Sequence, residues 1–483
     1  MNYWSIVMCA AVVAGVSTAA PEGSVGTVNF ETVRNESKMF NVTDFGAVGD
    51  GETLNTQALQ AAIDACTQAG GGTVRVPAGE YVSGTLWLKS DVTLSLDHGA
   101  YILGSQNHSD YPIDDLRPSR EGNSECFLYA EDAVNIRLEG LGVIDSRGKP
   151  EFFPKKAGPG GKDNRPRLIR FENCRNVTFS GLTYKNPAFW GIHLVECKDV
   201  HIARVKIRMQ DNHSNNDGFD IDGCENVLIE NCDIMAGDDS ICLKSSKYPC
   251  RNIVVRNCVV SSHTAAFKCG TSSSGGFIDI DVSNCYFYDC PMGGIKLQIV
   301  DGGRMENVNI SRIVMDNVGS PLFVRLGNRG RVYGANTYTG TALLNPNESE
   351  GASVGSVKGI HIRDVVANVT IQPREKTRPD REFATAGPVM ISGIPGHYVE
   401  DVVLENFKVS YPGNGTEKDA KRKVVEDETR YPEQYFFGIL PAWGAYIRHA
   451  ENIEFKNVDL SVREPDARER IVLDDVTGFK ETK

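Results

Sequence analysis

Five residues that can transfer protons or carry charge follow one another at regular spacing in the middle of the chain. Asp217 lies in NNDGFDID, Asp238 and Asp239 in AGDDSICLKS, His263 in SSHTAAFKCG and Lys296 in GGIKLQIVDGG. Asp217 precedes the Asp pair by 21 or 22 residues, and His263 follows Asp239 by 24 residues. If the chain repeats a structural unit of this length, the five side chains lie at nearly the same phase on one face.

Three carboxylates within a few ångströms repel one another, so at least one of them should keep its proton near neutral pH. Cleavage of a glycosidic bond needs that division of roles, with a protonated acid at the leaving oxygen and an ionised base on a water. We expect Asp238 and Asp239 to point to opposite sides of a strand. One would then face the glycosidic oxygen, and the other would turn with Asp217 towards the water. Room for a water between acid and base predicts inversion at the anomeric carbon.

Other cations of the same region are candidates for binding the substrate. We expect Lys296 to bind a substrate carboxylate, and Lys268 and Arg325 to line the same groove. His263 is predicted to belong to the catalytic group, because it shares the phase of the aspartates. For Lys244 and Arg329 the sequence allows two interpretations, a role in the site or an ordinary solvated charge.

Several other residues are interpreted structurally. We assign Asp220, Asp222 and Asp281 to turns or to the repeat itself, which is the usual role of Asp in such segments. Trp190 and Trp443 could stack on sugar rings, as could Tyr446, but burial is the commoner fate of Trp.

The elements that must position these residues form a repeat of short strands. Segments that alternate apolar and polar residues, with Asn or Asp near the start, begin at Cys174, Cys197, Cys224, Cys250, Phe277 and Met305. The starts lie 23, 27, 26, 27 and 28 residues apart. Alternation indicates strands with one buried face, and a period of 20–30 residues without helical patterns indicates a solenoid. We therefore predict an all-β fold, a single-stranded right-handed parallel β-helix, as a catalytic domain over residues 40–475.

Stacked coils also explain the cysteines. The chain has 13 cysteines, and most of those in the repeat fall at two repeat positions. The first set is Cys174, Cys197, Cys224 and Cys250, and the second is Cys232, Cys258 and Cys285. We interpret both sets as interior ladders of small apolar side chains. Disulfides between Cys242 and Cys250 or between Cys269 and Cys290 remain open, because sequence alone does not fix pairing.

The ends of a solenoid need caps, and its loops are candidates for a groove. Residues 55–69 have an amphipathic helical pattern, with Asn55 as N-cap and glycines 70–72 after the end. We place this helix over the N-terminal mouth. The polar stretches 105–130, 145–168, 328–356, 373–386 and 411–436 are longer than ordinary connections, so we expect them to flank a functional groove.

Composition limits the partners and the location of the chain. A net charge of −12 over 483 residues argues against nucleic acid, and an acidic substrate would need a local cluster of cations. Residues 1–20 are predicted to be a signal peptide, with a short membrane anchor as the alternative. We therefore expect a secreted protein, extracellular or periplasmic, that acts as a monomer without cofactor, metal or membrane partner.

At these motifs the sequence resembles glycoside hydrolase family 28, the polygalacturonase-like, pectin-active enzymes. NNDG resembles the family's N-T-D, GDDS its G-D-D, SSHTA its G-H-G, and GIK its R-I-K. The resemblance implies Asp238 as general acid, Asp217 and Asp239 as the water-activating pair, and a plant or algal acidic polysaccharide, or its oligosaccharides, as substrate. Gly294 stands where the family has an arginine, which removes a bidentate carboxylate partner. Galacturonan, rhamnogalacturonan or another acidic polysaccharide therefore all remain open.

Two other functions are compatible with the same scaffold. Clustered aspartates can hold Ca²⁺, which would suit a calcium-dependent polysaccharide lyase. A β-helix can also bind glycans without cleaving them. Neither alternative is excluded by the motifs alone.

Overall fold

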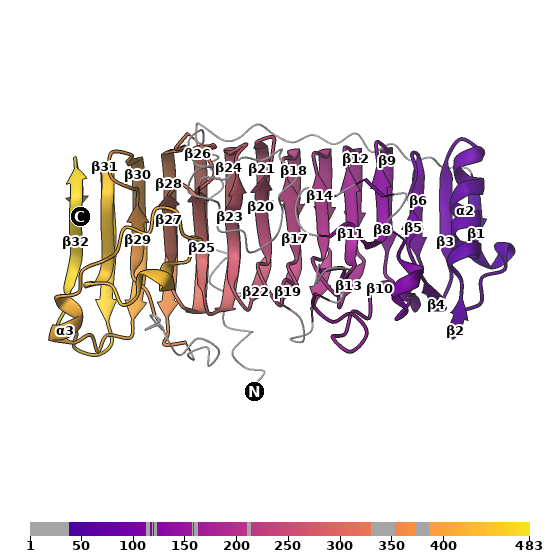
Figure 1. Cartoon of the computed structure of the whole chain (residues 1–483), viewed down its shortest axis with the longest axis horizontal. Coiled ribbons are helices and arrows are strands. Elements are labelled where there is room, and N and C mark those ends of the chain that lie inside the picture. The colour runs from indigo at the N-terminus through magenta and orange to yellow at the C-terminus, as the bar shows by residue number, and fades with distance from the viewer. Residues whose placement is uncertain are drawn as a thin grey trace.

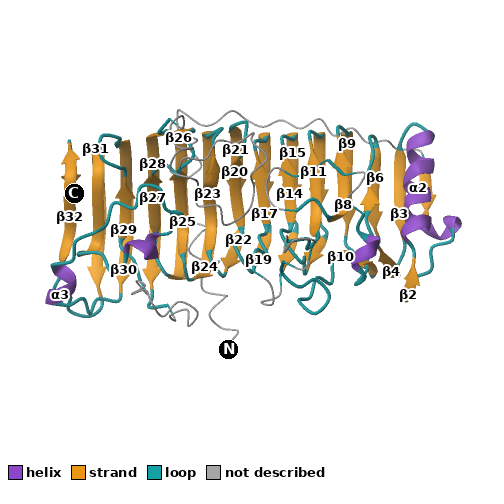
Figure 2. Ribbon diagram, viewed as in Figure 1, coloured by secondary structure: helices purple, strands orange, loops and turns teal. Residues whose placement is uncertain are grey.

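The protein is described by a computed structural model of the chain. The structure describes residues 38–483 apart from 113–115, 118, 120–122, 157, 159–162, 210–213, 330–352 and 373–385. Residues 1–20, the predicted signal peptide, lie outside the described residues. Strands run parallel from coil to coil along one axis, as Figures 1 and 2 show, and the predicted right-handed parallel β-helix is confirmed.

The strands form three faces of the solenoid that continue into one another. The first face consists of β5 (Leu86–Trp87), β8 (Cys126–Glu131), β11 (Arg167–Glu172), β14 (Ile192–Val195), β17 (Phe219–Asp222), β20 (Ile241–Ser245), β23 (Ala265–Ser273), β25 (Gly293–Ile299), β27 (Leu322–Leu326), β29 (Val389–Ser392), the start of β31 (Ala442–Val462) and β32 (Glu469–Thr477). The second consists of β1 (Met39–Asn41), β3 (Gly72–Val76), β6 (Val92–Leu96), β9 (Val134–Gly140), β12 (Arg175–Ser180), β15 (Lys198–Ala203), β18 (Glu225–Glu230), β21 (Cys250–Arg256), the long strands β24 (Phe277–Cys290), β26 (Arg304–Val318), β28 (Ser356–Val369) and β30 (Val399–Tyr411), the rest of β31, and β33 (Lys480–Thr482). The third consists of β2 (Asp50–Leu54), β4 (Gly79–Ser83), β7 (Ala100–Gly104), β10 (Val143–Asp145), β13 (Thr183–Lys185), β16 (Lys206–Arg208), β19 (Asp233–Ala236) and β22 (Val259–Ser262), followed by the ends of the long strands.

The register of the second face reproduces the spacing of the repeat. Arg175 pairs with Lys198, Lys198 with Glu225, and Glu225 with Arg251, which are 23, 27 and 26 residues apart. Along each strand, the alternate apolar residues enter one continuous core that fills the solenoid. Equivalent positions of neighbouring coils therefore touch, as the sequence repeat predicts.

The recurring Asn and Asp residues turn the backbone at the start of the strands of the second face. Asn226 and Asn252 have φ angles of 57° and 54°, in the left-handed region that Asn tolerates better than most residues. The Asn252 amide donates to Asn226 Oδ1 at 2.9 Å, and the Asn226 amide donates to Asp199 Oδ1 at 2.9 Å. One residue thus fixes the backbone turn and bonds the next coil.

The two predicted sets of cysteines form interior ladders in the core. All twelve cysteines among the described residues are buried free thiols, so neither of the two candidate disulfides is present there. The thiol of Cys224 donates to Leu194 O at 3.4 Å, and that of Cys250 donates to Ile221 O at 3.2 Å, each one coil back.

Helix α2 (Thr56–Gln68) covers the N-terminal end of the core, which confirms the predicted cap (Figure 1). It buries Leu59, Ala62, Ile63 and Cys66. Asn55 precedes the helix but makes no side-chain capping bond, contrary to prediction. Its amide instead accepts a hydrogen bond from Val48 N at 2.7 Å and donates to Val48 O at 3.0 Å, which secures the preceding loop.

The other helices among the described residues are short and lie in loops. They are η2 (Val42–Phe45), η3 (His108–Asp110), α3 (Glu417–Ala420) and η6 (Gln434–Phe437). None of the helices within the described ranges has the length and apolar character needed to cross a lipid bilayer.

Candidate active site

A row of polar side chains runs along the outside of the first face. Asp220 pairs in register with Cys242, Cys242 with Lys268, and Lys268 with Lys296. The residues on either side of them in the strands, such as Ile221, Leu243 and Leu297, belong to the core, so the four side chains point away from it. All four are nevertheless buried.

The three aspartates predicted to be catalytic come together at the upstream end of this row. Gly218 N donates to Asp239 O at 2.9 Å, which places Asp217 and Asp239 side by side on adjacent coils. One carboxylate oxygen each of Asp217, Asp238 and Asp239 lies within 4.8 Å of the others. Asp217 and Asp239 are each 4 % exposed, whereas Asp238 is half-buried. The spacing of about one coil therefore predicted this cluster correctly.

The predicted orientation of the adjacent pair is wrong. Asp238 and Asp239 lie between β19 and β20 rather than inside a strand. Alternation of strand side chains does not apply there, and both carboxylates converge on Asp217.

Asp239 is held as an anion by its surroundings. Lys268 Nζ donates to Asp239 Oδ2 at 2.6 Å, and Thr264 Oγ1 donates to Asp239 Oδ1 at 2.7 Å. Burial alone would raise the pKa of Asp239, but the charges of Lys268 and Lys296 and these hydrogen bonds lower it to about 2. Asp239 is therefore ionised at any pH above the strongly acidic range.

Asp238 and Asp217 have the opposite tendency. Burial, followed by the neighbouring charge of Asp239, raises the pKa of Asp238. Burial, followed by the charges of Asp220 and Asp238, raises the pKa of Asp217 well above its usual range. Asp217 Oδ1 is buried and accepts no hydrogen bond from the protein. The cluster thus combines one stable anion with two carboxyls that tend to hold protons, and their titration belongs to the group as a whole.

Thr264, the residue after His263 in the SSHTA motif, links the two central carboxyls. Its hydroxyl lies 2.7 Å from Asp239 Oδ1 and 3.2 Å from Asp238 Oδ1. His263, one residue earlier, is exposed in the turn between β22 and β23, and its main-chain N–H donates to Ala236 O at 3.2 Å.

Of the five residues expected at nearly the same position of successive coils, only Asp217 and Asp239 are in register. Ala265 O accepts a hydrogen bond from Ser240 N, so His263 precedes the level of the aspartates. Lys296 lies in the row of Asp220, three positions after Asp217.

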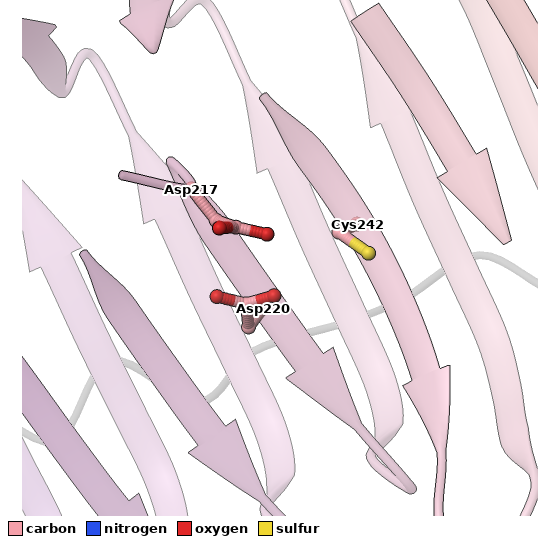
Figure 3. Close-up of side chains that lie close together, drawn as sticks. All are labelled: Asp217, Asp220 and Cys242. Carbon is pink, nitrogen blue, oxygen red and sulfur yellow. The ribbon is translucent and has the colours of Figure 1, made fainter. Parts of the chain in front are cut away.

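Asp220 belongs to this site, although the sequence interpretation assigned it to the repeat. It is completely buried, and Lys244 Nζ lies 3.5 Å from its carboxylate. Figure 3 shows Asp220 beside Asp217, with Cys242 on the neighbouring strand. Its place in FDID could have identified it as a site residue, because strand alternation puts it in the same outward row as Lys268. By contrast, Asp222 accepts hydrogen bonds from the N–H and hydroxyl of Ser246, at 2.8 and 2.7 Å, as a structural residue would.

Two sets of potential metal ligands share Asp217. The first is Asp217, Asp238 and Asp239, and the second is Asp217, Asp220 and Cys242, each with one ligand atom per residue within 4.8 Å. Each set contains a carboxylate that already faces a buried ammonium, Lys268 in the first and Lys244 in the second. Lysines thus supply the positive charge that a cation would otherwise bring, and a divalent ion would be repelled by them.

Lys268 and Lys296 form a buried pair of cations next to the carboxylates. Lys296 is completely buried and makes an ion pair with Glu433, whose other oxygen lies 3.8 Å from Lys268 Nζ. Tyr431, two residues before Glu433, is 45 % exposed, and its hydroxyl lies 3.4 Å from Lys268 Nζ. The repeat gives no indication of Tyr431 or Glu433, because both come from a distant loop.

Arg325 lies further along the same face. It is 1 % exposed, and its guanidinium donates to Ser392 Oγ and Gly393 O, both at 2.8 Å, and to Glu426 O at 2.9 Å. Arg329 makes an ion pair of 2.5 Å with Asp301. Both guanidinium groups are therefore bound to other groups of the protein.

The aromatic candidates are not free for stacking in this groove. Trp190 is 5 % exposed and packs between Lys244 and Arg167, whose cationic groups lie 4.3 and 4.8 Å from its ring. Trp443 packs edge-on against Tyr411, and Tyr446 is buried. The exposed ring nearest the carboxylates among those discussed is Tyr431.

Comparison with known proteins assigns the family. The family model of glycosyl hydrolases family 28 matches residues 66–337, which is more than half of the chain. The chain belongs to glycosyl hydrolases family 28. This family 28 protein is accordingly a glycoside hydrolase, and the predicted resemblance is confirmed.

Relatives with curated names support the assignment. The family 28 chain is 29% identical over 365 residues to a probable polygalacturonase from Vitis vinifera, covering 71% of this chain and 72% of that relative. It is 29% identical over 302 residues to an exo-poly-alpha-D-galacturonosidase from Dickeya chrysanthemi, covering 51% of this chain and 50% of that relative, so it spans only half of that protein. A family 28 exopolygalacturonase from Yersinia enterocolitica shares the fold, with a TM-score of 0.71 at 22% identity over 92% of this chain and 78% of that one.

Proposed function

We propose that this family 28 hydrolase cleaves a glycosidic bond in a pectic or related acidic polysaccharide, or in its oligosaccharides. The polygalacturonase names of its relatives support the substrate class. The observation that carries the proposal is the pairing of an anion, Asp239, with a proton-holding neighbour, Asp238. A glycosidase needs one ionised and one protonated carboxyl group at the same pH.

In this mechanism Asp238 is the general acid. It is the most exposed of the three aspartates, so it can reach the leaving oxygen. Asp239 accepts the proton of the attacking water while Lys268 keeps it ionised. Asp217 Oδ1, which has no protein partner, is available to orient that water. We propose that His263, which is exposed one residue before Thr264, contacts the sugar rather than the water.

We further propose inversion of configuration. The nearest oxygens of the three carboxyls lie within 4.8 Å, closer than the separation of about 6.5–9.5 Å usual for inverting pairs. Both oxygens of Asp239 accept strong bonds, from Lys268 and Thr264, which lower the nucleophilicity of this carboxylate towards the anomeric carbon. Each oxygen keeps a further lone pair that can accept a proton from the attacking water, as inversion requires.

The cations next to the cluster complete the proposal. Lys268 and Lys296 form the floor of a sugar subsite that adjoins Asp239. Arg325 supports this subsite by holding the loop at Glu426 rather than by touching sugar. We also propose that residues 40–475 act as one catalytic domain, that residues 1–20 direct secretion, and that the enzyme works as a monomer.

Replacement of Asp238 tests the catalytic assignment. Asp238→Asn should lower the release of reducing ends from pectic oligomers by at least about a thousandfold, because the acid is lost while the shape remains. Asp279→Asn is the matched control, since Asp279 is a partly exposed aspartate in β24, outside this site. Unchanged release by Asp238→Asn would refute the proposed acid.

Two product measurements separate the alternatives. Proton NMR during the first turnovers should show the product anomer opposite to that of the substrate bond, and retention would refute inversion. A lyase would instead create a double bond that absorbs in the ultraviolet and would lose activity with a chelator if it depended on calcium. Absorbing products would refute hydrolysis.

A further inference from the structure

The sugar subsite beside Asp239 carries its own carboxylate. Glu433 is 4 % exposed and lies against both lysines of the floor, in an ion pair with Lys296 and 3.8 Å from Lys268. Lys268 in turn donates to Asp239. The two ammonium groups therefore meet two protein carboxylates, and the positive charge of this floor is balanced before any substrate arrives.

The loop that brings Glu433 is fastened at several points. Gln298, which lies in β25, donates to Pro432 O at 2.8 Å, and Gln434 donates to Pro388 O at 2.8 Å. Further upstream in the loop, Arg325 binds the carbonyl of Glu426. Bonds on both sides of Glu433 fix its position, so displacing its carboxylate from Lys296 would break a buried ion pair, which is strongly unfavourable.

Gly294 supplies no cation at the position where the family motif has an arginine. Gly294 lies two residues before Lys296 in β25, and a Cβ atom there would lie 2.4 Å from the sulfur of Met315. A larger side chain at this position would have to displace Met315. Neither Gly294 nor the balanced lysines can therefore offer a new salt bridge to an acidic sugar.

We propose that Glu433 is a specificity-determining residue that makes this subsite select an uncharged sugar, either a neutral sugar or a uronate in its ester form, over a free uronate. The inference rests on the proposed function for the location of the subsite. A free uronate would bring a third carboxylate to two ammonium groups. At the effective dielectric constant of a protein site, the charge of Glu433 about 5 Å from the uronate carboxylate weakens binding of the uronate by about a hundredfold, relative to an uncharged side chain. Tyr431, which is 45 % exposed beside Lys268, provides an amphipathic surface suited to a neutral ring.

The test compares oligogalacturonides of one length in their free-acid and methyl-ester forms. The wild-type enzyme should have a kcat/KM at least about tenfold higher for the ester, and Glu433→Gln should shift the ratio towards the free acid by about a hundredfold. Glu433→Asp keeps the charge and should keep the preference. Glu400→Gln is the matched control, because Glu400 also pairs with a lysine, Lys358 at 3.1 Å, but on the exposed second face. A wild-type preference for the free acid, or an unchanged ratio in Glu433→Gln, would overturn the inference.

A binding experiment separates this inference from the proposed function. Galactose and galacturonate differ at C6, where one has a hydroxymethyl group and the other a carboxylate. Ligand-detected NMR should show tighter binding of galactose to the wild-type protein and a gain for galacturonate in Glu433→Gln. If no substrate is cleaved, the proposed function fails, and this comparison still decides the role of Glu433. If Glu433→Gln does not fold, the wild-type preference alone decides, and tighter binding of galacturonate would overturn the inference.

Discussion

Removing the ammonium of Lys268 should move the whole pH–rate profile to higher pH. Lys268→Met keeps the length of the side chain but deletes the charge 2.6 Å from Asp239 Oδ2. In the native protein the pKa of Asp239 is lowered from 3.8 to about 2 even though burial opposes the change. The net effect corresponds to about 2–3 kcal/mol, at 1.36 kcal/mol for each pH unit.

The sign follows from the role of Asp239 as base. A base must be ionised, so kcat/KM falls as pH drops through its pKa. Without Lys268, only Lys296 and Thr264 still oppose burial, which is the largest influence on this carboxyl, and we expect the pKa of Asp239 to exceed roughly 4. At pH 3 the ionised fraction would then fall from about 90% to below about 10%. Lys268 also lowers the pKa of Asp238, so the alkaline limb set by the acid should rise as well.

The assay is the ratio of kcat/KM at pH 3 to that at pH 6, measured separately for each protein. This ratio cancels any general loss of activity, and circular dichroism at each pH reports whether the protein stays folded. Lys198→Met is the control, because Lys198 pairs with Glu225 at 2.8 Å on the exposed second face. A folded Lys268→Met enzyme whose acid limb stays below pH 3 would refute the argument that Lys268 keeps the base ionised.

Three further predictions follow from individual contacts. Tyr431→Ala should raise KM for oligosaccharides about tenfold by deleting an exposed ring, whereas Tyr431→Phe should change it less than threefold; equal effects in steady-state kinetics would argue against stacking. Asp217→Asn should abolish most activity yet raise Tm at pH 7 by about 1–4 °C, because a folded pKa above the unfolded value costs stability as pH rises past the unfolded pKa of about 3.9. This gain in Tm should shrink at pH 4 in calorimetry, and a lower Tm at pH 7 would contradict the raised pKa. Reducing agent should leave Tm unchanged, because the twelve described cysteines are free thiols, and a fall of several degrees would reveal a disulfide.

Much of the architecture could be predicted because a solenoid is built from short-range rules. Alternation along each strand fixes which side chains enter the core, and the distance between repeats fixes which residues of neighbouring coils touch. The spacing between Asp217 and Asp239 was therefore enough to place them together. The same reasoning failed for the orientation of Asp238 and Asp239, because those residues lie in a turn, where strand alternation does not hold.

Asp220 shows a different limit. Its position in FDID already placed it on the outward face, but Asp is common in the turns of this repeat, and the sequence does not show that Lys244 lies 3.5 Å away. The sequence likewise gives no role to Thr264. In the structure, the turn after β22 brings the hydroxyl of Thr264 within hydrogen-bonding distance of both Asp238 and Asp239.

The length of each coil, the interior ladders and the three aspartates on adjacent coils follow from the sequence, since all of these depend on neighbours one repeat apart. Tertiary structure alone decided the charge balance of the site. Glu433 meets Lys296 across 137 residues, through a loop whose path no repeat dictates. Its position depends on anchors such as Gln298 on the first face, and only the folded chain brings such anchors and the loop together.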